Sequence, residues 1–374
     1  MSLKVLHLVY SLAPGGMENG IVNMSNILPG EKISIEVCCL DRAGRMASRL
    51  PENCRLHVLG KKPGFDRRLP GLLRDKICEI RPDIIHTHNL GPLIYAALAR
   101  FLGASVPILH GEHASLTTTD LSFRKRLQRK LLYRLCKKIH TVGYSMTCQL
   151  DELKLSKMPV LTLQNGVDTR LFKPGREKAQ VRKELLDLPK GCVIVGVFGR
   201  FGPYKRHEFL LEAFARGGEK LPDLHLLVVG GGGDRERMVL NKIQCHPFRS
   251  RIHVVGYKTD PVPYYQCLDL LLLPSENEGL SNCALEAMAC GVPVLTNQNC
   301  GSEDFILHGV DGFVRPLVST GDLVDSLTDI FARGVLALED VSIMARKKME
   351  SDFSLDSMAN NYRQAYQDLV RIPS

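Results

Sequence analysis

The sequence predicts an α/β protein made of two doubly wound domains. Short apolar, β-branched runs alternate with stretches of helical spacing, which is the pattern of strand–helix units around a parallel sheet. These runs are apolar throughout, as strands buried on both faces of a parallel sheet must be. The length of 374 residues fits about two domains of ordinary size.

The predicted strands fall into two series. The first comprises residues 3–10, 33–40, 83–89, 107–112 and 139–143. The second comprises residues 192–199, 224–230, 252–256, 268–274 and 292–297. A turn-forming, charged stretch at 165–186 separates them and is the predicted linker. The final segment predicts a helix, because one apolar stripe recurs in it at three- and four-residue intervals: Leu355, Met358, Tyr362, Tyr366 and Leu369.

The composition is that of an ordinary folded protein, with 44% hydrophobic and 24% charged residues. Its 12 cysteines include no CxxC pair and the N-terminal residues show no signal-peptide pattern, so we expect reduced thiols, a cytoplasmic location and no zinc site. No apolar run approaches the ~18 residues that a membrane-spanning helix needs. The net charge of +9 predicts anionic partners. Nucleic acid is not among them, because no spacing typical of a nucleic-acid-binding module occurs and Trp is absent.

The most informative stretch is residues 274–294, PSENEGLSNCALEAMACGVPV. It leads from an apolar strand through a polar loop into a helix that Ser281 or Asn282 can cap. Loops at the carboxyl ends of parallel strands bind ligands in open α/β sheets, and the N–H groups at a helix start attract phosphate. We therefore expect the loop from Gly279 to Asn282, which includes Leu280, to face an anionic ligand.

Two carboxylates belong to the same stretch. Glu278 precedes the predicted helix and Glu286 lies within it, with seven residues between them. One carboxylate can reach a group at the ligand site while the other accepts hydrogen bonds from a neighbouring diol. The spacing alone is also compatible with two solvated surface glutamates.

A second cluster follows another apolar strand, in the residues GRFGPYKR at 199–206. Arg200 and Lys205 can converge there on a diphosphate, neutralise its charge and stabilise it as a leaving group. Two exposed basic residues in a loop are the alternative. After the first strand of the chain, Gly15 and Gly16 allow the backbone to approach a ligand closely. That turn matches neither a P-loop nor the dinucleotide fingerprint.

Together these stretches resemble the retaining glycosyltransferase family four, whose members have the GT-B fold of two Rossmann-like domains facing a central cleft. The resemblance covers nearly the whole chain and rests on GGMEN, DIIHTHN, HGEH, QNGVD, GR followed by YK, VVGGG, VVGY and SENEGLSNCALEAMACGVPV. The last motif is the most specific, because it reproduces the family's two glutamates at their spacing. The resemblance implies an acceptor-side domain of residues 1–165 with the helix 355–374, and a nucleotide-sugar-binding domain of residues 166–354.

The resemblance also implies roles for the carboxylates and cations. Glu286 is expected to hold the ribose hydroxyls of a nucleotide, and Glu278 to contact the donor sugar. Arg200 and Lys205 are expected to grip the diphosphate.

Backbone groups complete the expected site. The amides of Gly279, Leu280, Ser281 and Asn282 are expected to bind the phosphates or the sugar. The turn at Gly15 and Gly16 is expected to close over the diphosphate from the first domain. The base is expected near Val255, Gly256 and Tyr257.

The family also uses a histidine at the cleft wall of the first domain. Two candidates stand three residues apart, His110 and His113, and the Glu-His order favours His113 as the residue that contacts the reacting sugar. His86 and His88 share one face of a strand, and we interpret them as structural. The neighbours Cys245 and His246 lack any further ligand pattern, so no metal site is expected there.

The implied reaction is transfer of a sugar from a nucleotide-diphosphate sugar to a hydroxyl acceptor, with retention at the anomeric carbon and without a metal ion or other cofactor. The chain looks most like bacterial transferases of exopolysaccharide or lipopolysaccharide assembly, whose acceptors are usually lipid-linked. Two alternatives are a nucleotide-sugar epimerase of the GT-B type and a non-catalytic regulatory subunit with the same fold.

Residues 122–140 predict an amphipathic helix with a strongly cationic polar face. One interpretation is an apolar stripe that faces the core and a solvated basic face. The stripe comprises Phe123, Leu127, Leu131, Leu132 and Leu135, and the basic face comprises Arg124, Lys125, Arg126, Arg129, Lys130, Arg134, Lys137 and Lys138. The other is that the cations lie against anionic lipid and hold the protein peripherally at the inner face of the cell membrane.

Overall fold

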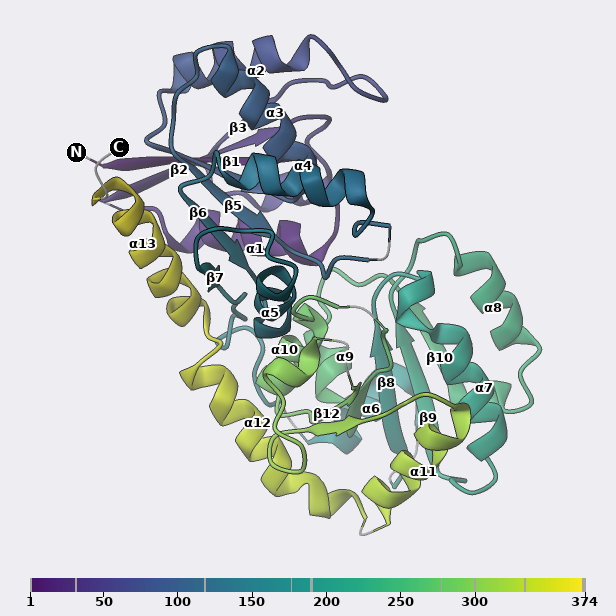
Figure 1. Ribbon diagram of the computed structural model, residues 1–374. Coiled ribbons are helices and arrows are strands. Elements are labelled where there is room, and N and C mark those ends of the chain that lie inside the picture. The colour runs from purple at the N-terminus through teal and green to yellow at the C-terminus, as the bar shows by residue number, and fades with distance from the viewer. Residues whose placement is uncertain are drawn as a thin grey trace. The chain divides into compact units, whose positions relative to one another are not determined.

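The computed structural model describes residues 2–30, 32–117, 119–175, 177–188, 191–276, 278–298, 301–332 and 334–371. The chain divides into two compact units (Figure 1). Unit 1 consists of residues 1–166 and 355–374, and unit 2 of residues 167–354. Each contains a parallel sheet with helices on both faces, so the predicted α/β class with two doubly wound sheets is confirmed.

Unit 1 contains a seven-stranded sheet in the order β3-β2-β1-β4-β5-β6-β7, with every neighbouring pair parallel. Its strands are β1 (Leu3–Val9), β2 (Ile33–Cys39), β3 (Arg55–Val58), β4 (Ile84–His88), β5 (Ile108–Glu112), β6 (Lys138–Thr141) and β7 (Val160–Thr162). Its helices are α1 (Gly16–Ile27), α2 (Leu69–Ile80), α3 (Leu90–Phe101), α4 (Phe123–Tyr133), α5 (Tyr144–Glu152) and α13 (Leu355–Arg371).

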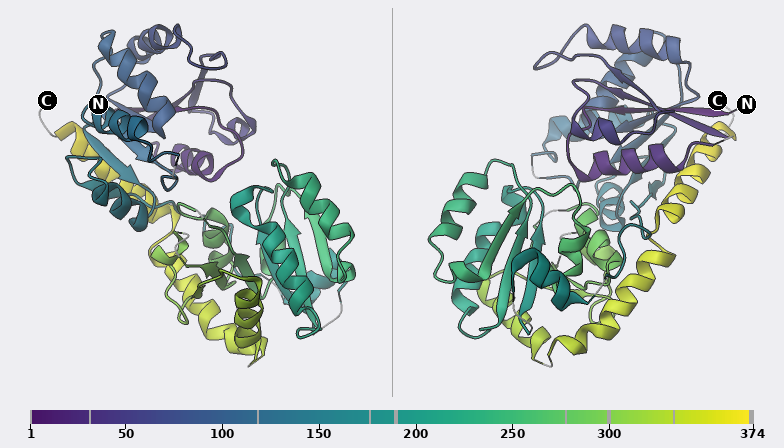
Figure 2. Two further views of the ribbon diagram at one scale, coloured as in Figure 1. Left: turned by 45° about the vertical axis from the view of Figure 1, so that its right-hand side comes forward. Right: turned by 180° about the vertical axis from the view of Figure 1, so that it is seen from behind.

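Alternating residues of these strands supply two separate cores, one on each face of the sheet. Val5 and Val9 face a core that contains residues of α1 and α13, whereas Leu6 and Leu8 face one built with α2, α3 and α4. The start of β1 and the end of α13 lie side by side in every view (Figures 1 and 2). The apolar stripe predicted for the last helix is therefore confirmed, since Met358, Tyr362, Tyr366 and Leu369 are all buried against this sheet.

Unit 2 contains a six-stranded parallel sheet in the order β10-β9-β8-β11-β12-β13. Its strands are β8 (Val193–Phe198), β9 (Leu224–Val229), β10 (Ile252–Gly256), β11 (Leu270–Leu273), β12 (Val294–Asn297) and β13 (Phe313–Arg315). Its helices are α6 (Lys178–Leu186), α7 (His207–Gly217), α8 (Glu236–Gln244), α9 (Val262–Gln266), α10 (Asn282–Ala289), α11 (Thr320–Phe331) and α12 (Glu339–Ser351). Helices α7, α8 and α11 share one core with the sheet, and α10 packs on α12 and α9.

All ten predicted strands occur, but the linker prediction is wrong in its second half. Residues 178–186 form helix α6, which is anchored in unit 2 by a buried arginine. Arg182 donates hydrogen bonds to the carbonyl oxygens of Cys267 (2.8 Å) and Cys192 (2.9 Å) and pairs with Asp269 at 2.6 Å. The charged residues that suggested a solvated linker therefore include one that holds the helix in place.

The helices of the described residues fall short of what a membrane span needs. None of them combines the length and the apolar character needed to cross a bilayer.

Candidate functional site

The order of strands in unit 2 reverses between β8 and β11, which are hydrogen-bonded neighbours. The loops that follow them, 199–206 and 274–281, therefore begin side by side at the carboxyl edge of the sheet. The amide of Glu276 donates a 3.1 Å hydrogen bond to the carbonyl oxygen of Tyr204 and ties the loops together. Open α/β sheets bind ligands at such a switch point.

Lys205 and Glu278 form an ion pair across these two loops, with 2.5 Å between Nζ and Oε1. The Ser275 hydroxyl donates a second hydrogen bond, 2.9 Å long, to the same carboxylate oxygen. Both charged side chains are partly exposed, so a ligand can reach them. The structure thus brings together the cation and the carboxylate that the sequence predicted, and the pair can bind a phosphate through Lys205 and a hydroxyl through Glu278.

Glu286, on α10, is held by a tyrosine that the sequence analysis missed. The Tyr265 hydroxyl donates a 2.7 Å hydrogen bond to Oε2 of Glu286. Its ring stacks on Phe198, with 4.0 Å between the centroids. Burial and the nearby Glu286 carboxylate raise the pKa of Tyr265 well above its ordinary value, so the hydroxyl remains a donor. No signal in the sequence distinguished Tyr265 from its neighbour Tyr264.

Helix α10 begins at Asn282 with Ser281 as its N-cap, as predicted, although the Ser281 side chain makes no capping hydrogen bond. Leu280 and Ser281 are buried. Behind this loop, a Cβ at Gly301 would lie 2.4 Å from the carbonyl oxygen of Glu278. A glycine is therefore required at 301 for the loop to keep this path.

The other two predicted donor-site residues make no hydrogen bond or ion pair with Lys205 or Glu278 within the described residues. Arg200 lies on the first loop, and its exposed guanidinium makes no hydrogen bond or ion pair with any residue in the described part of the chain. Tyr257 follows the edge strand β10, which is separated from β8 by β9, and its ring is 66% exposed. Its amide lies 3.6 Å from the position of a Cβ on Gly231, so the loop after β9 contacts this turn.

In unit 1 the glycine turn and the predicted histidine occupy one edge of the sheet. Gly15 is the N-cap of α1 and Gly16 its first residue, directly after β1, while His113 follows β5. Asn89, after the intervening strand β4, accepts a 3.0 Å hydrogen bond from the amide of His113. The Asn89 side chain also donates to Sδ of Met17 at 3.3 Å. This asparagine, which the sequence analysis did not single out, links the two predicted features.

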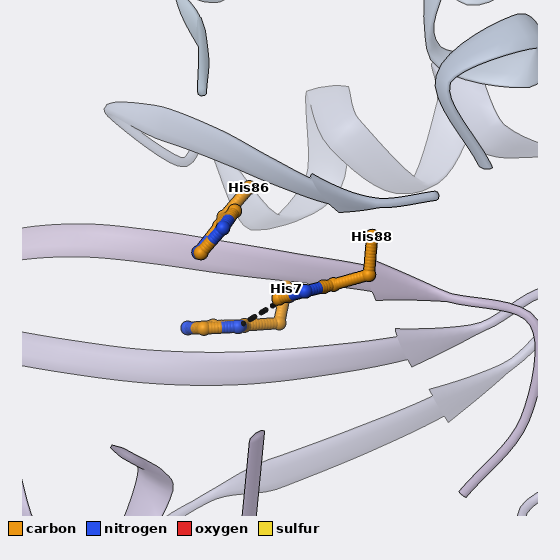
Figure 3. Close-up of side chains that lie close together, drawn as sticks. All are labelled: His7, His86 and His88. Carbon is orange, nitrogen blue, oxygen red and sulfur yellow. Dashed lines mark hydrogen bonds between the residues drawn. The ribbon is translucent and has the colours of Figure 1, made fainter. Parts of the chain in front are cut away.

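Histidines gather on one face of the same sheet. His7 on β1 and His86 on β4 are register partners, and His88 lies two residues further along that face. The three rings are buried, with centroids 4.2 to 5.2 Å apart (Figure 3). One nitrogen from each lies within 4.8 Å of the others, which is compatible with a metal ion.

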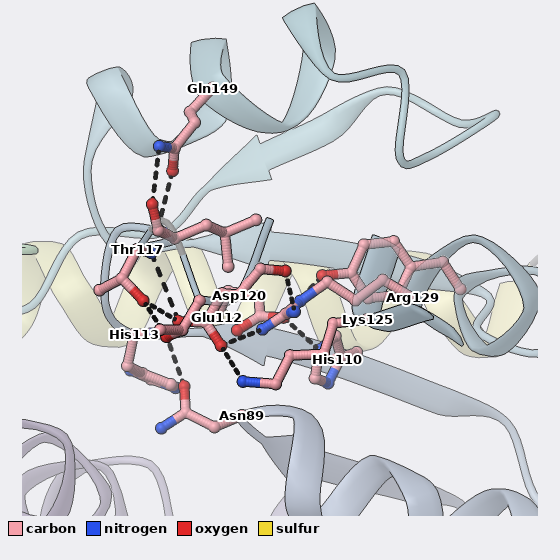
Figure 4. Close-up of polar contacts among 12 residues, drawn as sticks. Asn89, His110, Glu112, His113, Thr117, Asp120, Lys125, Arg129 and Gln149 are labelled. Carbon is pink, nitrogen blue, oxygen red and sulfur yellow. Dashed lines mark hydrogen bonds and ion pairs between the residues drawn. The ribbon is translucent and has the colours of Figure 1, made fainter. Parts of the chain in front are cut away.

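His110 points to the opposite face from His113, because neighbouring residues of a strand alternate. Its ring lies 2.9 Å from the Thr87 hydroxyl and 3.6 Å from Oε1 of Glu112. Glu112 also accepts hydrogen bonds from Arg129 Nε (3.0 Å) and the Tyr133 hydroxyl (2.6 Å), in the network of Figure 4. Although burial raises the pKa of Glu112, His110, Arg129 and Tyr133 together lower it to about 2. This network attaches α4 to the sheet.

The predicted helix over 122–140 is wrong in its extent, and the interpretation that its apolar stripe faces the core is wrong as well. Helix α4 ends at Tyr133, and residues from Lys138 onward form strand β6. Moreover, most of the apolar stripe of the helix is not buried, although Leu132 is partly buried against the core. Arg129 and Tyr133 are the residues it buries, whereas three apolar residues at four-residue spacing are exposed: Phe123 (80%), Leu127 (46%) and Leu131 (52%). Arg129 and Tyr133 bond to the buried carboxylate of Glu112 at the end of β5, so their face of α4 turns toward the core.

Two family models match most of the chain. The model "Glycosyltransferase Family 4" matches residues 14–171, and the model "Glycosyl transferases group 1" matches residues 192–333. The first therefore covers most of unit 1, and the second covers the loops with Lys205, Glu278 and Glu286.

Two curated relatives match most of the chain. The UDP-Gal:alpha-D-GlcNAc-diphosphoundecaprenol alpha-1,3-galactosyltransferase of Escherichia coli is 22% identical and covers 98% of this chain and 97% of its own. The N-acetyl-alpha-D-glucosaminyl L-malate synthase of Bacillus anthracis is 24% identical and covers 83% of this chain and 81% of its own. Among solved structures, Anabaena HepE in complex with UDP superimposes with a TM-score of 0.84 at 18% identity, covering 98% of this chain and 100% of its own.

Proposed function

The chain belongs to glycosyltransferase family 4, and from this premise we propose that it transfers a sugar from a nucleotide-diphosphate sugar to a hydroxyl acceptor with retention of anomeric configuration. Its two Rossmann-like units are those of the GT-B fold that the sequence predicts. The observation that carries the proposal is the switch point of unit 2, where Lys205, Glu278 and the tyrosine-held Glu286 lie on two adjoining segments.

The proposed roles follow the chemistry of each group. Glu286, fixed by Tyr265, accepts hydrogen bonds from the two ribose hydroxyls, and Glu278 accepts from hydroxyls of the donor sugar. Lys205 and Arg200 bind the diphosphate, and the start of α10 adds its positive helix end. A divalent metal is then not required, since these groups supply the positive charge that the leaving diphosphate needs.

The remaining assignments concern unit 1 and the base. We assign Gly15 and Gly16 to the diphosphate and His113 to a hydroxyl of the reacting sugar. Tyr257 is assigned to the surroundings of the base. These roles come from the family resemblance, and the position of each residue at the carboxyl edge of its sheet supports them.

A lipid-linked glycan is the proposed acceptor. The name of the E. coli relative specifies an acceptor sugar on diphosphoundecaprenol, and that relative matches the chain from end to end. The proposed setting is the cytoplasmic face of the cell membrane.

The proposal is tested by incubating the protein with a panel of nucleotide sugars and a lipid-linked acceptor extract. Release of nucleoside diphosphate together with a labelled lipid product is the expected result. Interconversion of nucleotide sugars without an acceptor would instead identify an epimerase, and neither product with any donor would identify a non-catalytic subunit.

Replacing Glu286 with alanine is expected to raise the Kd for the donor nucleotide about 10- to 150-fold, which corresponds to the roughly 1.5 to 3 kcal/mol of a charge-assisted hydrogen bond. Isothermal titration with the nucleoside diphosphate measures this change. Glu212→Ala, which removes an exposed carboxylate from α7, is the control. Equal affinity of the Glu286 variant and the wild type would contradict the ribose assignment.

The exposed stripe of α4 supports a peripheral attachment to anionic membranes. Phe123, Leu127 and Leu131 can enter the lipid interface, while the exposed Arg124 and Arg134 contribute around 1 kcal/mol each near an anionic surface. The presence of both apolar and cationic groups on the open side of one helix favours lipid over a soluble anion.

Co-sedimentation with liposomes tests this attachment. The protein is expected to bind anionic but not neutral vesicles, less so at high salt. The variant Phe123→Ser with Leu127→Ser is expected to lose binding about tenfold or more. The matched control changes two apolar residues of unit 2 that are at least as exposed, Leu336→Ser with Ile343→Ser. Wild-type binding that persists in the α4 variant would reject this surface.

A further inference from the structure

Six buried or partly buried rings of unit 1 form one continuous hydrogen-bonded chain. From its deep end to its outer end the chain runs His140, His86, Tyr366, His7, His88, His113. The successive distances are 2.8 Å (His140 Nε2 to His86 Nε2), 2.8 Å (His86 Nδ1 to the Tyr366 hydroxyl), 3.3 Å (that hydroxyl to His7 Nε2), 2.9 Å (His7 Nδ1 to His88 Nε2) and 2.9 Å (His88 Nδ1 to His113 Nε2).

The chain crosses four strands on the face covered by α1 and α13. The register pairs His7 with His86, His88 with Gly111, and Gly111 with His140. Gly111 lies beside the rings of this hydrogen-bonded chain. A Cβ at this position would lie 2.4 Å from Nε2 of His140 and 2.9 Å from Nε2 of His113. A glycine at this position therefore leaves the space that two of the rings occupy.

The rings are neutral at physiological pH. Burial lowers the pKa of His7 to about 3, and burial with the nearby His110 lowers that of His113 to about 4. Burial and the neighbouring histidines lower the pKa values of His86, His88 and His140 well below the ordinary value. Each imidazole therefore carries one proton, and every link needs one donor and one acceptor.

The deep end fixes the direction of all the links. Nδ1 of His140 lies 3.3 Å from the carbonyl oxygen of Thr141, which can only accept, so the proton of His140 is on Nδ1. Its Nε2 must then accept from Nε2–H of His86, whose Nδ1 accepts from the Tyr366 hydroxyl. The same alternation continues outward, because each group that donates on one side must accept on the other.

The outer links complete the pattern. His7 donates from Nε2 to the Tyr366 oxygen and accepts at Nδ1 from His88, and His88 accepts at its own Nδ1 from Nε2–H of His113. His113 is left with an unprotonated Nδ1, and this atom is buried and has no hydrogen-bond partner among the described residues. If every link ran in the opposite direction, His113 would carry its proton on Nδ1, and this buried N–H would have no partner. Proteins tolerate a buried donor without a partner less well than an acceptor without one.

We infer that this chain is a tautomer lock, in which His7, His86, His88, His140 and Tyr366 are positioning residues that keep Nδ1 of His113 unprotonated, so that this buried atom accepts a hydrogen bond from a sugar hydroxyl when the donor displaces the groups that cover it. The hydroxyl as ligand rests on the proposed function, whereas the tautomers rest on the contacts alone. A His113 with its proton on Nδ1 would present a donor, and the same hydroxyl would have to turn its oxygen toward the ring.

A metal ion at His7, His86 and His88 is the competing use of these rings. The chain explains more of the contacts, because it gives a partner to both ring nitrogens of each of the three and also accounts for Tyr366 and His140. A metal ion would need the lone pair of one nitrogen on each of these rings, and every such nitrogen already takes part in a hydrogen bond of the chain.

Long-range ¹H–¹⁵N spectra of the full-length protein with ¹⁵N-labelled histidine test the lock directly, since they report which ring nitrogen is protonated. The expected pattern is a proton on Nδ1 of His140 and on Nε2 of His7, His86, His88 and His113. A proton on Nδ1 of His113 in the wild type would overturn the inference. Bound metal that is removed by chelation with a change in the His7, His86 and His88 signals would overturn it in favour of a metal site.

The matched pair Tyr366→Phe and Tyr362→Phe tests the link between the deep anchor and the outer ring. Both tyrosines are fully buried on α13, but the Tyr362 hydroxyl donates to the Leu163 carbonyl at 3.3 Å and lies outside the chain. In Tyr366→Phe, His113 is expected to populate both tautomers, while Tyr362→Phe keeps the wild-type pattern. An unchanged His113 in a folded Tyr366→Phe protein would contradict the lock, and the wild-type spectra decide if that variant does not fold.

Kinetics then connect the tautomer to turnover. Tyr366→Phe is expected to lower kcat/KM about two- to tenfold, in proportion to the molecules that lose the competent tautomer, and Tyr362→Phe to stay within about twofold of the wild type. A mixed tautomer with unchanged kcat/KM would overturn the catalytic part of the inference. A wild type without transfer activity on any donor would instead refute the proposed function and leave the tautomer assignment to the spectra.

Discussion

Replacing Lys205 with alanine is expected to lower kcat about 100- to 1000-fold while changing the affinity for the donor nucleotide by a much smaller factor. The lysine is held 2.5 Å from Glu278 before any ligand arrives, so its charge is positioned without reorganisation. This charge is needed most when the leaving diphosphate develops its own negative charge. Steady-state rates with saturating donor, together with nucleotide titrations, separate the two effects.

The removal of Lys205 also leaves Glu278 without its cation, and the experiment must distinguish this from lost catalysis. The variant Lys205→Ala with Glu278→Gln removes both charges and is expected to remain as slow as Lys205→Ala. Lys242→Ala, which removes a surface lysine from α8, is the control for a general loss of charge. A double variant with nearly wild-type kcat would show that the unpaired carboxylate, and not the missing lysine, causes the loss.

The same assays in excess chelator test the expected independence from metal ions. Undiminished wild-type activity supports a site in which Lys205, Arg200 and the start of α10 supply the positive charge. Activity that is lost on chelation and restored by Mg²⁺ or Mn²⁺ would contradict this assignment.

The central strands could be predicted from the sequence because they are buried on both faces and read as unbroken apolar runs. The edge strands β3, β7 and β13 were missed because they are not long, unbroken apolar runs. They contain four, three and three residues, and at an edge one side of each strand lacks a neighbour. A short segment of this kind lacks a periodic signal that distinguishes it from a loop.

The site was predictable where a single motif carries both position and chemistry, as with Lys205, Glu278 and Glu286. The parts of the site that depend on how separate strands and helices pack together could not be predicted from the sequence. The orientation of α4 is decided by Arg129 and the buried Glu112, which belong to different elements. The histidine chain draws on four strands and a helix at the end of the chain, so neither His7 nor His140 could be connected to His113 by spacing in the sequence.

Acidification from pH 7 to pH 5.5 is expected to destabilise unit 1 by roughly 6 kcal/mol, which is comparable with the whole stability of a domain. The five histidines of the chain have pKa values in the folded state far below 6.5, about 3 for His7 and about 4 for His113. The unfolded chain therefore binds more protons than the folded one from about pH 6.5 downward. Their stabilisation is fully present above pH 6.5 and is lost as the pH falls toward 4.

Unit 2 should lose less stability over the same range. It also contains histidines with lowered pKa, among them His207 and His253, each at about 4 because of burial, but they are fewer than the five rings of the chain. Hydrogen exchange measured by mass spectrometry follows the two units separately. The peptides of unit 1 are expected to lose protection at a higher pH than those of unit 2.

The slope of the free energy of unfolding against pH gives the number of protons that the protein takes up on unfolding, so it reports directly on the buried histidines. Each buried neutral histidine contributes about 1.4 kcal/mol per pH unit below its unfolded pKa. Denaturant titrations at several pH values are expected to give an uptake near five protons on unfolding of unit 1 around pH 5.5. His140→Gln is expected to lower this number by about one even where the variant itself is less stable. A free energy of unfolding that stays constant from pH 7.5 to pH 5 would show that the folded rings take up protons as readily as those of the unfolded chain, which contradicts a chain of buried neutral rings.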